Sequence, residues 1–106
     1  MADIELTDDL ILLQKRSDTA WVRVQEIQDR HGRPSAEGGW TDDAHSEWDT
    51  AWKVWGDQTD VVREAIAAWA GESGQSRINI EGRLKGEVRG GKGPQIWPEA
   101  KEPNQE

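Results

Sequence analysis

A stripe of tryptophan and small apolar residues between Thr41 and Trp69 constrains the fold of this chain more than any other feature. Its apolar residues recur at spacings of three and four, which places them on one face of a helix. The chain has seven tryptophans but no phenylalanine, tyrosine or cysteine. We therefore expect indole rings to form much of its core. The stripe comprises Ala44, Trp48, Ala51, Trp52, Trp55, Val62, Ile66 and Trp69.

This stripe predicts a helix over residues 42–70. Thr41 is a suitable N-cap, and two aspartates follow it in the first turn, where the helix dipole favours carboxylates. Gly56 interrupts the pattern, but the spacing of apolar residues keeps its phase across it. We therefore expect one helix, with a break at Gly56 as the alternative. Gly71 is expected to end it.

An earlier helix is predicted over residues 8–31. Thr7 can cap its N-terminus, and leucine, valine and isoleucine then follow a seam close to a coiled-coil pattern. Gly32 and Pro34 are typical of a helix end. The connection over residues 32–40 is short enough to return the chain antiparallel, so the two helices should form a hairpin.

Residues 77–89 carry two conflicting patterns. Apolar residues or glycine occupy every even position, as in a half-buried strand. However, Ile80, Leu84 and Val88 also stand one helical turn apart, and Glu81 precedes Lys85 by four residues, which favours a helix. Two long helices set the context, so we expect a short third helix over about 78–89.

The remaining residues, 90–106, are rich in glycine, proline and charge and are predicted to be a disordered tail. The expected fold is thus all-α: an antiparallel two-helix hairpin with a short third helix in one domain, residues 1–89, followed by that tail. Trp97 leaves two alternatives open. It either folds back on the helices or docks into a groove of another protein.

Charge is distributed unevenly along the chain. The net charge is -8, which makes nucleic acid an improbable main partner, since phosphate contacts require clustered lysine and arginine. Residues 77–92 nevertheless have a net charge of +3. An accessory regulator that contacts nucleic acid through this segment is the alternative function. Its basic residues are Arg77, Arg83, Lys85, Arg89 and Lys92.

Two motifs suggest ligands only weakly. Residues 86–93 resemble a phosphate-binding P-loop, but Gly93 replaces the Ser or Thr that binds magnesium and Pro94 discourages a following helix. A nucleotide-binding protein is thus a weaker alternative. His45 and Asp49, with His31, could form a surface metal site, but an ordinary polar face is the simpler interpretation. We expect no cofactor, no metal and no catalytic site.

The sequence therefore predicts a small non-enzymatic protein that binds another protein or a second copy of itself. Aromatic side chains dominate binding hot spots, and a two-helix hairpin cannot cover so many indoles by itself. No apolar run is long enough to cross a bilayer, and without a basic signal segment a cytoplasmic location is expected. The candidate interaction residues are Trp48, Trp52, Trp55, Trp69 and Trp97.

Overall fold

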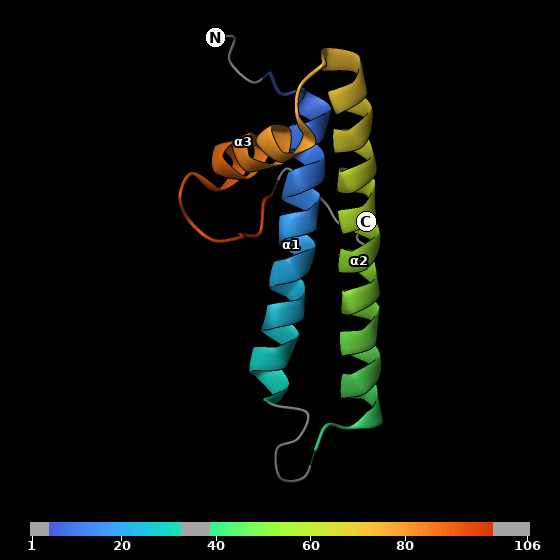
Figure 1. The fold of residues 1–106 in the computed structure, drawn as a ribbon. Coiled ribbons are helices and arrows are strands. Elements are labelled where there is room, and N and C mark those ends of the chain that lie inside the picture. Colours follow the sequence, from blue (N-terminus) through green and yellow to red (C-terminus); the bar gives the residue numbers. More distant parts are fainter. Residues whose placement is uncertain (1–4, 33–38, 99–106) are drawn as a thin grey trace.

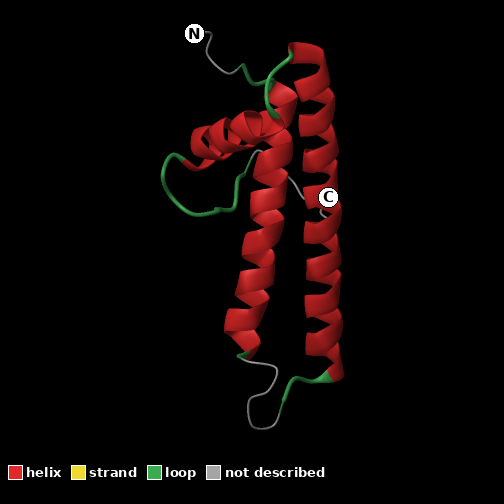
Figure 2. Ribbon diagram, viewed as in Figure 1, coloured by secondary structure: helices red, strands yellow, loops and turns green. Residues whose placement is uncertain are grey.

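The computed structural model describes residues 5–32 and 39–98, which form three helices and, within these ranges, no strand. Helix α1 spans Asp8–His31, α2 spans Asp42–Ser73 and α3 spans Arg77–Arg89. Helices α1 and α2 lie side by side and antiparallel, while α3 crosses α1 near one end of the pair (Figure 1). The predicted all-α hairpin with a short third helix is confirmed (Figure 2).

Both long helices begin at the expected threonine caps. The Thr7 hydroxyl accepts a hydrogen bond from the Leu10 N–H at 3.1 Å, and the Thr41 hydroxyl accepts one from the Ala44 N–H at the same distance. Each bond satisfies a backbone donor that the helix itself leaves free. Trp40, just before the second cap, packs its ring against His45 with ring centroids 5.3 Å apart. This contact fixes the angle at which the chain enters α2.

Helix α2 continues past its predicted end at residue 70. It runs without interruption through Gly56 and through Gly71, and its C-cap is Gly74, at φ 74°. A left-handed residue at this position costs a glycine little. The Ser73 hydroxyl also donates to the Trp69 carbonyl at 2.6 Å. Gly71 keeps a helical backbone conformation, and the second of the two nearby glycines, Gly74, ends the helix.

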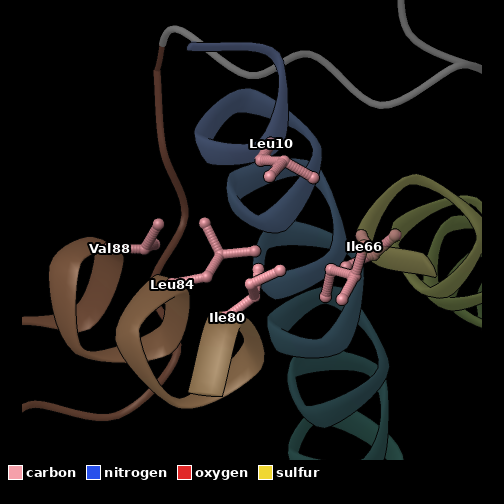
Figure 3. Packing of buried hydrophobic residues seen from close by; sticks show 6 residues of the cluster. Leu10, Ile66, Ile80, Leu84 and Val88 are labelled. Atoms are coloured by element: carbon pink, nitrogen blue, oxygen red, sulfur yellow. The ribbon is translucent and has the colours of Figure 1, made fainter. Parts of the chain in front are cut away.

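Residues 77–89 follow the helical rather than the alternating pattern. Ile80, Leu84 and Val88 are buried on one face and point toward α1 (Figure 3). Ile78, which the strand pattern would place beside Ile80, is 81 % exposed. Lys85 donates to Glu81 at 2.7 Å, as expected one turn apart. The helical period prevails because the α1–α2 pair offers one apolar surface to pack against, and the described residues provide no partner strand.

The best-buried part of the molecule is where all three helices meet. Side chains of α3 fill the angle between the first turns of α1 and the second half of α2. We call this group the aliphatic cluster, and burying each such side chain contributes roughly 1.5–3 kcal/mol to stability. It consists of Leu10, Val62, Ile66, Ile80, Leu84 and Val88.

After α3 the chain returns across α1, and we call residues 90–98 the strap. Trp97 packs beside the aliphatic cluster, and its backbone N–H donates to the Thr19 hydroxyl at 3.0 Å. The Lys15 ammonium lies 5.0 Å from the centre of its ring. Of the two alternatives for Trp97, the structure shows the one in which it folds back on its own helices. The structure describes residues 90–98 of the predicted tail, in which it has no helix or strand, whereas residues 99–106 lie outside the described residues.

Candidate functional site

Five tryptophans gather in the part of the hairpin that α3 does not cover. Their rings form a continuous chain in which neighbouring centroids lie 4.9–5.6 Å apart, mostly edge to face. Such geometry matches the positive edge of one ring to the negative face of the next. We call this group the aromatic cluster: Trp21, Trp40, Trp48, Trp52 and Trp55.

The aromatic cluster is only partly removed from water. Trp40 is buried, and its indole N–H donates to the Gly32 carbonyl at 3.0 Å. The other four rings are partly exposed. The indole nitrogens of Trp48 and Trp52 are shielded from solvent yet find no acceptor among the described residues. A buried donor without an acceptor lowers stability by about 1–3 kcal/mol. The same holds for the indole nitrogen of Trp97 beside the aliphatic cluster, whose own side chains have no polar groups.

A groove of about 370 Å³ lies where the aromatic cluster meets α3. Trp21 from α1 and Trp55 from α2 form part of its lining, together with charged side chains of α3. We call it the aromatic groove. The remaining lining residues are Gln14, Ser17, Asp18, Thr59, Val62, Arg63, Ile66, Glu81, Lys85, Arg89 and Pro94.

A buried ion pair joins α3 to α1 in this groove. Asp18, whose side chain is 1 % exposed, accepts two hydrogen bonds from the Arg89 guanidinium, at 2.8 and 3.1 Å. Gln14 donates a third, at 2.9 Å. The hydrogen bonds to Asp18 raise the pKa of Arg89, against the opposing effect of burial. Three hydrogen bonds thus engage the Asp18 carboxylate, and those from Arg89 link α3 to α1.

The structure separates the tryptophans that the sequence grouped together. Trp48, Trp52 and Trp55 lie together in the aromatic cluster, whereas Trp69 lies at the opposite end of α2, where its indole N–H donates to the Glu5 carbonyl at 2.9 Å. Trp97 lies on the strap.

Two members of the aromatic cluster, Trp21 and Trp40, were not among the predicted interaction residues. Trp21 adjoins the apolar seam of α1, and Trp40 precedes the α2 cap. The sequence shows the place of each residue relative to its helix, but it does not show that the two rings would pack into the same cluster.

The predicted basic patch is partly used within the chain. Arg89 pairs with Asp18, and Lys85 pairs with Glu81. Lys85 also lowers the pKa of Glu81, chiefly through their hydrogen bond. Arg83 and Lys92 are exposed and form no ion pair with any residue in the described ranges. Contact of this segment with nucleic acid stays a prediction.

Within the described chain, the two weak ligand motifs lack the geometry of an open P-loop and of a three-ligand metal site. In the P-loop-like stretch, residues 86–89 are the last turn of α3, so their backbone N–H groups are not arranged in an open phosphate-binding loop. The His45 ring packs against that of Trp40 at an angle of 54°, and His31 Nε2 lies 3.6 Å from a carboxylate oxygen of Glu47. No group of three potential metal-ligating residues comes together within residues 5–32 and 39–98.

Comparison with protein-family models, with curated proteins and with solved structures finds no match to this chain. None of the helices formed by the described residues combines the length and the apolar character needed to cross a membrane. The aromatic groove is a hollow on the surface of the described residues that combines indole rings with charged side chains.

Proposed function

We propose that this chain is a non-enzymatic protein–protein interaction module whose binding surface is the aromatic cluster and the adjoining groove. One observation carries the proposal: Trp21, Trp48, Trp52 and Trp55 stay partly exposed where α1 and α2 have no third helix over them. Tryptophan is among the residues most enriched at the energetic centres of interfaces.

The aromatic cluster and the side chains around it have the properties that a protein interface requires. The rings hold one another in fixed orientations, so binding would immobilise few additional side chains. A partner would remove the remaining indole surface from water, at roughly 25 cal/mol per Å² of apolar area. The acidic side chains around the rings would form the polar rim that surrounds most interface cores.

Gly56 offers a direct test. It lies in α2 beside the aromatic cluster, and a Cβ built on it meets nothing within 4 Å. A photo-crosslinking amino acid introduced at residue 56 of the full chain, in the cells that make it, should yield discrete protein adducts. The matched control is the same substitution at Gly71, which is also in α2, also unobstructed, and distant from the rings. Equal labelling at the two positions would contradict the proposal.

A further inference from the structure

We propose that the partner of the aromatic groove is a second copy of this chain. In this arrangement two chains lie antiparallel, and α3 of each occupies the space beside the aromatic cluster of the other. The inference rests on the proposed function and adds the identity of the partner. Three independent features of the described residues support it: the shape of the molecule, its charge and the outer face of α3.

Shape is the first of these features. Helix α3 crosses one end of the hairpin, and the other end consists of α1 and α2 alone (Figure 1). Reversing a second copy about a two-fold axis places its three-helix end beside the two-helix end of the first. Both contacts are then made by the same surfaces, as a closed isologous dimer requires. The four long helices would adopt the packing of a four-helix bundle.

Charge is the second feature. The end of the hairpin that carries the aromatic cluster, residues 21–32 and 39–57, has a net charge of -4, from seven acidic and three basic side chains. Residues 77–92, by contrast, have a net charge of +3. The antiparallel arrangement brings these opposite charges together twice, whereas a parallel arrangement would juxtapose like charges.

Individual side chains are suitably placed for this pairing. Asp29 follows Asp18 by about three helical turns, and Asp49 precedes Arg63 by about four. Because Asp18 and Arg63 both line the groove, the two exposed aspartates flank its continuation along the aromatic cluster. Exposed Arg83 and Lys92, which pair with no described residue, are the matching cations on the partner.

The outer face of α3 is the third feature. Ile78 is 81 % exposed, and Gly82 and Gly86 follow it one and two turns later on the same line. A Cβ at either glycine would meet nothing within 4 Å, so contacts within the described chain do not require these glycines. This face of α3 allows another helix to approach closely, because glycine has no side chain. Ile78 supplies an apolar side chain that can pack against the indoles of the partner.

Charge exchange between two variants tests the geometry. The first variant carries Arg83→Glu and Lys92→Glu, and the second carries Asp29→Lys and Asp49→Lys; all four positions are exposed. Each variant alone sets like charges against each other, so in sedimentation equilibrium its self-association should weaken about tenfold or more. The two mixed together should form a heterodimer about as tightly as the unchanged chain forms its dimer. Glu64→Lys with Glu72→Lys, two exposed acids of α2 outside the contact, is the control and should dimerise normally.

The outcomes separate this inference from the proposed function. A chain that remains monomeric at about 1 mM, yet crosslinks from residue 56 to other proteins, overturns the second copy as partner and leaves the interaction module standing. The antiparallel arrangement is overturned if both charge variants dimerise as tightly as the unchanged chain. It is also overturned if mixing the two variants does not restore dimerisation. Circular dichroism of each variant, compared with the unchanged chain, ensures that a loss of association is not a loss of folding.

Discussion

At the end of the rod that α3 covers, six aliphatic side chains are withdrawn from water, and Ile80 and Leu84 are 0 % exposed. At the hairpin end, five larger indole rings are packed together, and four of them remain partly exposed. The difference comes from the number of helices. Two helices share one seam, which can bury a narrow row of side chains, whereas a third helix closes the angle between them.

If the proposed function is correct, stability and partner binding reside at different ends of the rod. The aliphatic cluster, the Asp18–Arg89 pair and the strap tie all three helices together and should dominate the free energy of unfolding. The aromatic cluster leaves apolar surface and two indole N–H groups without a counterpart in the described chain. The predictions below test this separation.

The largest effect is expected from Leu84→Ala. Leu84 is completely buried between α3 and the hairpin, so the substitution removes apolar burial and leaves a cavity, at a cost of about 2–5 kcal/mol. Urea unfolding followed by circular dichroism measures this loss. Val61→Ala, at an exposed position of α2, is the control and should change the free energy of unfolding by no more than about 0.5 kcal/mol.

The next largest is expected from Arg89→Ala, which leaves Asp18 buried without its cation. The cost should be about 2–3 kcal/mol, less than for a fully buried pair because Arg89 is partly exposed. Removing Asp18 as well should recover part of the loss, since the uncompensated charge is then gone. A double-mutant cycle on unfolding free energies measures the coupling, and purely additive effects would contradict the proposed link between α1 and α3.

Trp97→Ala should lower the free energy of unfolding by about 1–2 kcal/mol. This cost is smaller than that of truncating a fully buried aromatic side chain, because Trp97 is only partly buried. Hydrogen exchange should quicken in α3 and near Thr19, while the aromatic cluster keeps its protection. Substituting the neighbouring Ile96, which is exposed, with alanine provides the comparison. An equal loss in both variants would mean that the indole itself does not anchor the strap.

Gly56→Ala should raise stability by up to about 1 kcal/mol. The position is inside a helix and has room for the added methyl group, so alanine's higher helix propensity acts unopposed. Gly74→Ala is the opposite case, because its φ of 74° strains any residue with a side chain. Thermal unfolding of the two variants should therefore shift in opposite directions.

The smallest effect concerns the exposed Glu81–Lys85 pair. The pKa of Glu81 is lowered in the folded state, so the pair stabilises the fold at neutral pH. The contribution is lost as the pH falls through the folded pKa of Glu81, which lies below the usual value for a glutamate. Glu81→Gln should cost no more than about 0.5 kcal/mol at pH 7. The difference from the unchanged chain should vanish at low pH, and a difference that grew on acidification would show that another group is involved.

Local features of the fold could be predicted closely from the sequence. Thr7 and Thr41 were identified as caps because a hydroxyl can satisfy helix N–H groups that have no other partner. The stripe of Trp48, Trp52 and Trp55 follows from helical periodicity alone. The end of α2 could not be predicted exactly, because Gly71 and Gly74 are both suitable stop residues. The chain that follows decides which of the two adopts the left-handed conformation.

The candidate site could be predicted only in part. Trp21 lies more than thirty residues away from Trp55 in sequence, yet their rings lie 4.9 Å apart. The Asp18–Arg89 pair spans seventy-one residues. Neither contact has a local signal, because each depends on how the helices are rotated and aligned relative to one another.

From the sequence alone it was determined that this protein is helical, where its long helices begin and that indoles would line the contact between them. These properties depend on residues within a few turns of one another. Only the tertiary structure decided that residues 77–89 are a helix, that Trp97 returns to α1 and that four indoles remain partly exposed. Each of these outcomes depends on which apolar surface is left uncovered once the two long helices have packed, and that surface exists only in three dimensions.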